Sequence, residues 1–206
     1  MSRRFDTGGA PHFPPHSTVG GVMSQVLYAL VPGIAAHAWF FGPGILVQIL
    51  MAVGFAILFE ATLLKIRGRP LSLFLGDYSA VVTAVLFALC IPPLAPWWIA
   101  MTGMFFAIVI AKHLYGGLGN NPFNPAMVGY VAVLISFPQA MTSWLPPLSI
   151  APAAPDLAGT LHAILTGLPP AGLDWDTLTG ATPVSYTHLT LPTRSCQCRS
   201  RGAPGA

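Results

Sequence analysis

The sequence predicts an all-α, polytopic integral membrane protein with about five transmembrane helices. Hydrophobic residues make up 54% of the 206 residues and charged residues only 7%, whereas soluble domains carry about a quarter charged residues. Several apolar runs approach the roughly 20 residues that an α-helix needs to cross the hydrocarbon core of a bilayer. An irregular segment rich in Gly, Asn and Pro separates two of these runs, so we expect the helical array to contain a broken or re-entrant segment.

The distribution of charge excludes a nucleic-acid-binding protein. The formal net charge is +3, from nine Lys and Arg residues and six Asp and Glu residues. The whole excess comes from Arg194, Arg199 and Arg201 near the C-terminus. The rest of the chain is balanced and offers no basic patch for phosphates.

Residues 1–21 are polar, with several Pro and Gly residues, and predict a short cytoplasmic tail. We expect no secretory signal peptide, because residues 1–16 lack an apolar core. The first apolar run, residues 22–41, has Pro32 in its middle. A proline there removes a backbone donor and kinks or breaks a helix, which membrane helices tolerate when their neighbours satisfy the freed carbonyl. The run ends in aromatic residues typical of a membrane interface, and residues 41–44 predict a tight turn.

The second apolar run, residues 45–64, contains Glu60 near its end. An acidic residue within a membrane span is a candidate for a structural or ion-path role. The alternative is that Glu60 lies close enough to the interface to snorkel or to pair with the cations that follow it. Those cations are Lys65, Arg67 and Arg69.

The third run covers residues 77–91 and ends before a Pro-Pro pair. Asp77 at its start is a second candidate for an ion-path role, although hydrogen bonding between helices explains a polar residue there equally well. The fourth and fifth runs are residues 97–111 and 126–140. Together the five runs predict a membrane region over residues 22–141.

Between the fourth and fifth runs lies the segment AKHLYGGLGNNPFNPAMVGY, residues 111–130. Gly and Asn permit left-handed or tightly turned backbone, and Pro blocks the continuation of a helix. One interpretation is an ordinary connecting loop. The other is a break that packs within protein and lines a cofactor or ion site, because irregular backbone at membrane depth survives only there. In that case we expect these residues to pack against other spans: Gly116, Gly117, Gly119, Asn120 and Asn124.

Lys and Arg residues mark the cytoplasmic side of a membrane protein. They precede the first run, lie between the second and third runs, and recur at Lys112 between the fourth and fifth, while the other short loops have none. This predicts a cytoplasmic N-terminus and an extracytoplasmic segment over residues 142–183. Within that segment, residues 157–168 predict a short amphipathic helix on the membrane surface, because they are too few to span.

The stretch from Asp176 to Thr182 reads DTLTGAT. On its chemistry alone it is a flexible turn that presents a hydroxyl. Gly180 and Ala181 leave little bulk beside Thr182, so another enzyme's active site could reach its side chain. The string is short, and an ordinary turn explains it equally well.

Two longer strings carry a family resemblance. They are KHLYGGLGNNPFNPAMVGY, which begins at Lys112, and LISFPQAMTSWLPP, which begins at Leu134. Both closely resemble the RnfD family of Rnf electron-transport complex subunits, which is related to the NqrB subunit of the sodium-translocating NADH:quinone oxidoreductase. The resemblance extends from about Pro11 to Pro183.

The resemblance implies a covalently bound cofactor. The family carries FMN on the last threonine of an Asp-x-x-Ser/Thr-Gly-Ala-Thr motif, in a phosphoester linkage made by a flavin transferase. The matching residues here are Asp176, Thr179, Gly180, Ala181 and Thr182, with Thr182 as the attachment residue. Riboflavin is a second flavin that the sequence leaves open.

The implied protein is a multi-pass subunit of an ion-translocating ferredoxin:NAD oxidoreductase complex in a bacterial inner membrane. It would relay electrons coupled to the transport of H⁺ or Na⁺. Its expected partners are the other subunits of the Rnf complex, the flavin transferase and membrane lipid. We expect no catalytic residue and no metal site in this chain, because it would be one part of a redox-driven pump.

The sequence changes in character after Pro183. Residues 184–206 have no sustained apolar run, whereas the resembled family continues with further transmembrane helices that form a second half. Cys196 and Cys198 lack the partners of a metal site. We therefore expect this tail to be foreign to the family and assign it no function.

Two other functions are open. A solute channel or transporter with a fold like that of urea transporters would also use broken helices and Gly/Asn/Pro segments. A scaffold subunit would lack a cofactor of its own. The flavin motif favours the electron carrier, because a channel has no use for a phosphate-bearing site at Thr182.

Overall fold

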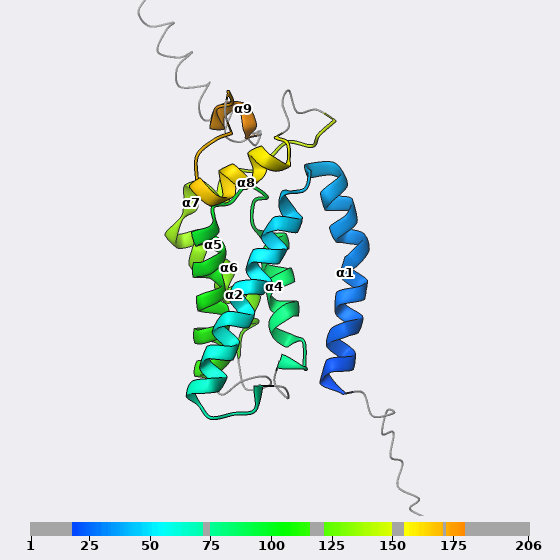
Figure 1. Ribbon diagram of the computed structural model, residues 1–206, viewed down its shortest axis with the longest axis vertical. Helices are drawn as coiled ribbons and strands as arrows, with labels where there is room; N and C mark the ends of the chain where they lie inside the picture. Colours follow the sequence, from blue (N-terminus) through cyan, green and yellow to red (C-terminus); the bar gives the residue numbers. More distant parts are fainter. Residues whose placement is uncertain (1–17, 72–74, 116–121, 150–154, 171, 180–206) are drawn as a thin grey trace, which may run out of the picture.

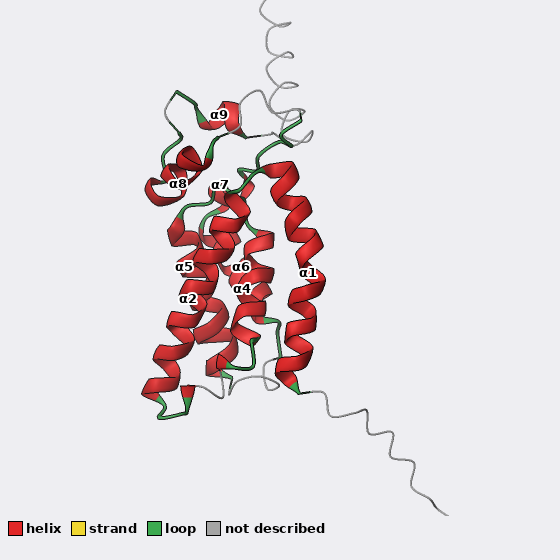
Figure 2. Ribbon diagram, turned by 45° about the vertical axis from the view of Figure 1, so that its right-hand side comes forward, coloured by secondary structure: helices red, strands yellow, loops and turns green. Residues whose placement is uncertain are grey.

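The computed structural model describes residues 18–71, 75–115, 122–149, 155–170 and 172–179, without the side chains of residues 176 and 177. Within these ranges every regular element is a helix, as Figure 2 shows. Three helices are long and apolar enough to cross a membrane: α1 (Val19–Phe41), α2 (Gly44–Ile66) and the continuous helix Trp97–Leu114. The prediction of an all-α, polytopic membrane protein is confirmed.

The helix Trp97–Leu114 has two parts with different winding. Its first part, α5 (Trp97–Met104), is an α-helix, and its second part, η1 (Phe105–Leu114), is a π-helix. π-Helical segments are rare and often lie at functional sites. Because η1 continues to Leu114, Lys112 lies within the helix. Our assignment of Lys112 to a loop is wrong.

Two shorter helices lie among the long ones. Both α4 (Ser79–Cys90) and α6 (Pro125–Ser136) have 12 residues and are therefore about 18 Å long. Tyr78 precedes α4 with a left-handed backbone, at φ 57°. The predicted third run is thus shorter than expected, and the fifth is divided at Phe137, after which a short helix follows, α7 (Pro138–Thr142).

The helices run alternately up and down in a bundle (Figure 1). α1 reaches the turn at Gly42, whose φ is 89°, and remains one continuous helix through Pro32. α2 packs against α4, α5 and η1, whereas α1 lies at the side of the bundle and has no buried residue.

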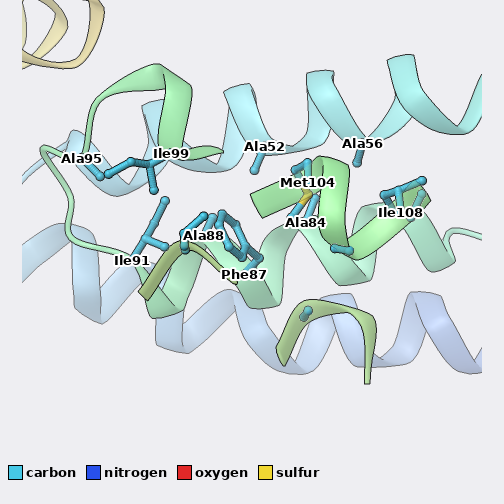
Figure 3. Packing of buried hydrophobic residues seen from close by; sticks show 14 of the residues in the cluster. Ala52, Ala56, Ala84, Phe87, Ala88, Ile91, Ala95, Ile99, Met104 and Ile108 are labelled. Carbon is cyan, nitrogen blue, oxygen red and sulfur yellow. The ribbon is translucent and has the colours of Figure 1, made fainter. Parts of the chain in front are cut away.

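The centre of the bundle is built from small side chains. Ala52 and Ala56 of α2 point into the cluster that also contains Met104 of α5 and Phe87 of α4 (Figure 3). α5 and α6 meet at glycines, since a Cβ on Gly129 would lie 2.5 Å from the carbonyl oxygen of Gly103. Small residues at crossings let membrane helices approach closely, so this core fixes the relative positions of α2, α4, α5 and α6.

Two further helices lie across one end of the bundle (Figures 1 and 2). They are α8 (Leu157–Thr166) and α9 (Trp175–Leu178). Asp156 caps α8 by accepting a hydrogen bond from the backbone N–H of Gly159. The predicted short helix in this region is confirmed, while its contact with a membrane surface stays a prediction.

Candidate functional site

Four polar side chains from three helices meet inside the bundle, at the end opposite α8. They are Glu60 of α2, Ser79 of α4, and Lys112 and His113 of η1. Each is less than a tenth exposed, and Glu60 is only 1% exposed. Charged side chains are almost never so deeply buried unless they are paired.

Lys112 is the centre of this polar cluster. Its Nζ donates to Oε1 and Oε2 of Glu60 and to Oγ of Ser79, each at 2.8 Å. An ammonium group has three protons to donate, so Lys112 is fully satisfied. Lys112 and Glu60 thus form a buried ion pair. Each charge compensates the other, and an unpaired charge at this depth would be strongly destabilising.

His113 lies on the other side of the same carboxylate. Its Nε2 is 3.3 Å from Oε2 of Glu60, within ion-pair distance, but the orientation forms no hydrogen bond. The backbone oxygen of His113 accepts a hydrogen bond from Nη2 of Arg67 at 2.8 Å. The backbone of His113 is therefore fixed to the end of α2, while its ring faces Glu60.

Asp77 extends the polar cluster toward the surface of the bundle. Its Oδ1 accepts from the backbone N–H of Ser79 at 2.9 Å and from Oγ of Ser79 at 2.6 Å. Asp77 is half-buried, whereas Ser79 is buried. A continuous series of polar contacts thus extends from Asp77 through Ser79 and Lys112 to Glu60.

The structure brings the two acidic candidates, Glu60 and Asp77, into one network. The expectation that Glu60 pairs with a cation is confirmed, but the expected cations are wrong. Its partners, Lys112 and His113, come from a helix more than 50 residues away, because Glu60 faces the bundle interior. Sequence reasoning alone missed this role of Lys112 and His113. The available clue in the sequence was that Lys112 directly follows an apolar run, while Glu60 within another apolar run needed a positively charged partner.

A pocket of about 630 Å³ lies near the other end of the bundle, where α8 and α9 lie. Trp98, Phe137 and Trp175 give it aromatic walls, and Thr179 also lines it. The hydroxyl of Thr179 donates to the backbone oxygen of Trp175 at 2.8 Å. Further polar side chains come from Ser136, Gln139 and Ser143.

The structure describes only part of the flavin motif. Asp176 lies in α9, and Thr179 directly follows that helix. Gly180, Ala181 and Thr182 lie outside the described residues. Among the described residues, no group of three or more His, Cys, Asp or Glu side chains could hold a metal ion.

The irregular segment is described only at its ends. Gly116, Gly117, Gly119 and Asn120 lie outside the described residues. Asn124 is exposed, and its Oδ1 accepts a hydrogen bond from the backbone N–H of Ala126 at 3.0 Å. Our expectation that Asn124 packs against other spans is wrong, because its side chain caps the start of α6 instead.

Comparison with known proteins gives close relatives, each named as the D subunit of an ion-translocating oxidoreductase complex. The protein of this name from Escherichia fergusonii is 51% identical over 174 residues, covering 84% of this chain and 49% of the relative. The one from Salmonella heidelberg is 49% identical over 194 residues, covering 91% of this chain and 55% of the relative. The one from Citrobacter koseri is 50% identical, covering 84% and 50%. The chain thus spans about half the length of these curated relatives.

A family model described as "NQR2, RnfD, RnfE family" matches residues 7–201. The matched range continues past Pro183, where we expected the resemblance to end. That the tail is foreign stays a prediction, since residues 180–206 lie outside the described part of the structure. The match covers most of the sequence, and the relatives align with 84–91% of it. The chain belongs to the NQR2, RnfD, RnfE family.

Proposed function

We propose that this chain forms part of the D subunit of an ion-translocating oxidoreductase complex and carries FMN covalently on Thr182. The observation that carries this proposal is the identity of about half of all aligned residues with proteins of that name. The DTLTGAT motif supplies the attachment residue, and the membrane helices supply the scaffold.

The size of the pocket beside Thr179 supports the proposal. Its volume of about 630 Å³ lies within the range of small-molecule sites. Trp98 and Trp175 are among the residues that line it, and aromatic rings favour offset-stacked or edge-to-face contact with another ring. Thr182 follows Thr179 by three residues, which span at most about 11 Å of extended chain. An FMN on Thr182 therefore lies within reach of this pocket.

FMN, when bound, would supply electron transfer, and the protein would position it and set its surroundings. The aromatic side chains of Trp98, Phe137 and Trp175 would hold the ring and exclude water from it. Ser136 and Gln139 would offer hydrogen bonds to its polar edge. The hydroxyl of Thr179 is already directed to the backbone of Trp175, so we assign it a positioning role and not the attachment.

The proposed location is a bacterial inner membrane with the N-terminus in the cytoplasm. Lys65 lies in the last turn of α2, and Arg67 and Arg69 follow this helix, at the end of the bundle where α1 begins (Figure 1). Positive residues favour the cytoplasmic side. The pocket then faces the extracytoplasmic side. The proposed partners are the remaining subunits of the complex, the flavin transferase and lipid.

The same proposal assigns Glu60 and Asp77 to the ion-transport function, because both lie in the buried polar network. Binding of riboflavin stays a prediction. No observation favours a solute channel, since the relatives are named as oxidoreductase subunits.

The test is to map the flavin by peptide mass spectrometry after co-expression with a flavin transferase. We expect an FMN mass adduct on the peptide containing Thr182 and its loss in Thr182→Ala. Thr182→Ser retains a hydroxyl and should keep part of the adduct. Thr179→Ala is the matched control and should keep most of it. An adduct on Thr177 or Thr179, or one that persists in Thr182→Ala, would contradict the assignment.

A further inference from the structure

We propose that Glu60 and His113 form a buried proton-binding site that opens to one surface of the bundle through Ser79 and Asp77. The link of this site to ion transport rests on the proposed function. The site itself rests on the contacts of four side chains. It deepens the proposed function by assigning the bound ion as a proton.

The first argument is the contact between Glu60 and His113. Their oxygen and nitrogen lie 3.3 Å apart in an interior where His113 is 6% exposed. A neutral imidazole carries one proton, on either ring nitrogen, and can take up one more. The imidazolium that results would lie against the ionised carboxylate of Glu60, and Nε2 of His113 has no hydrogen-bond partner among the described residues that would compete for this contact.

The second argument is that Glu60 has room for this proton. An ionised carboxylate offers about four lone-pair positions, and Lys112 occupies one on each oxygen. Oε2 therefore keeps an acceptor position for Nε2 of His113. One further proton would make the ring of His113 positively charged. The carboxylate of Glu60 beside it would offset that charge in this poorly solvated place.

The third argument is a path for the proton. Lys112 would first give a proton to Glu60, with which it shares two hydrogen bonds, and this frees a lone pair on Nζ. The hydroxyl of Ser79 donates to Asp77 in the structure, so it would have to turn before it gives its proton to Nζ. Asp77, protonated from water, would then give its proton to Oγ of Ser79. At the end Asp77, Ser79 and Lys112 hold as many protons as before. The Glu60–His113 pair holds one more.

The same geometry disfavours a metal cation. Hard cations require several oxygen ligands, but Nζ of Lys112 already occupies both oxygens of Glu60 and the oxygen of Ser79 at 2.8 Å. The ammonium group stands where a cation would have to bind. Among the described residues, no alternative cluster of metal ligands is present.

The surroundings of His113 add few other titratable groups. Glu60 comes from α2, Arg67 directly follows that helix, and Lys112 belongs to η1 itself. Asp77 lies behind Ser79, next to α4. α5 contains no titratable residue, and α6 contains only Tyr130. A change in the protonation of His113 is therefore governed mainly by Glu60.

The test measures the protonation of His113 directly, by ¹⁵N-histidine NMR of the full chain in lipid nanodiscs without flavin. His113→Gln assigns the resonance, and the exposed His162 of α8 is the internal control. Between about pH 8 and about pH 5, where histidines ordinarily change charge, we expect His113 to take up one proton. Replacing choline with Na⁺ at constant ionic strength should leave that uptake unchanged.

Two variants separate a proton site from a purely structural contact. Glu60→Gln removes the negative charge and should lower the proton affinity of His113 at least tenfold, leaving His162 unchanged. Should Glu60→Gln fail to fold, Glu60→Asp keeps the charge farther from the ring and should lower that affinity to a smaller extent. Ser79→Ala should leave the affinity unchanged and slow proton exchange at His113 at least tenfold.

Three results would overturn the proposal. They are a single protonation state of His113 over the whole pH range, a change in its proton uptake when Na⁺ replaces choline, and an unchanged rate of proton exchange at His113 in Ser79→Ala. None of these measurements needs the flavin. A failure of FMN attachment at Thr182 would therefore leave this inference standing, and a failure here would leave the flavin assignment standing.

Discussion

Replacing Lys112 with methionine measures how far the bundle depends on its buried ion pair. Lys112→Met keeps most of the apolar stem and removes the ammonium that holds both oxygens of Glu60. Glu60 is 1% exposed, so water cannot replace the lost contacts without opening the helices. Removing one partner of a buried pair costs about 3–5 kcal/mol. We expect the free energy of unfolding to fall by that amount.

The measurement is unfolding of the purified chain in mixed micelles, followed by circular dichroism during a titration with denaturing detergent. Lys65→Met is the matched control, because Lys65 is exposed near the end of α2. A surface change of this kind is expected to stay within about 0.5 kcal/mol of the parent chain.

A double variant completes the test. Glu60→Gln together with Lys112→Met removes both charges, and pairs replaced as a unit often cost little. We therefore expect the double variant to be at least about 2 kcal/mol more stable than Lys112→Met alone, a coupling within the range of residues in direct contact. Equal stability of Lys112→Met and Lys65→Met, or simple additivity in the double variant, would refute the reasoning.

Four further predictions concern the bundle and its orientation. Gly129→Ala should destabilise the protein by about 1–3 kcal/mol, because its Cβ would lie 2.5 Å from a backbone oxygen of α5; in the same unfolding assay Gly54→Ala, with open space around it, should be neutral or stabilising by up to about 1 kcal/mol. Asn124→Ala should cost about 1 kcal/mol through loss of the cap on α6, whereas Asn124→Asp should retain most of the stability. The cysteine of Ser149→Cys should react with an impermeant reagent from the extracytoplasmic side. Labelling from the cytoplasmic side alone would show that the predicted topology is wrong. Deleting residues 184–206 should leave membrane insertion and expression unchanged, and a marked loss of either would show that the tail contributes to the fold.

The features that the sequence predicted correctly have local causes. The turn at residues 41–44 follows from Gly and Pro, and the turn-forming residue Gly42 has φ 89°. The end of α4 before residues 92–93 follows from two prolines. The start of α8 follows from Asp156, a strong capping residue. In each case the deciding interaction spans only a few positions in the chain.

The polar cluster could not be predicted in the same way. Glu60 and Lys112 are 52 residues apart, and their contact depends on how α2 and η1 pack. The apolar pattern of residues 97–111 ends before Lys112, but the helix does not, because a buried partner offsets the cost of burying the ammonium. Tertiary packing therefore decided both the end of this helix and the location of its charge.

Both α4 and α6 are shorter than the runs that the sequence predicted, residues 77–91 and 126–140. The break after Ser136 coincides with Phe137, whose backbone is not helical, and with the proline that follows. For α4 the left-handed Tyr78 marks the start, which composition does not reveal, because such a conformation is unusual for a tyrosine.

The shortness of α4 has an electrical consequence. This helix extends about 18 Å from Ser79, little more than half of the roughly 30 Å hydrocarbon core. A membrane voltage falls mainly across the insulating layer, and moving one charge through 100 mV changes its energy by about 2.3 kcal/mol. In the proposed orientation Ser79 lies at the cytoplasmic end of α4, so a charge that moves along the whole of this helix crosses a little more than half of the insulating layer over which the voltage falls.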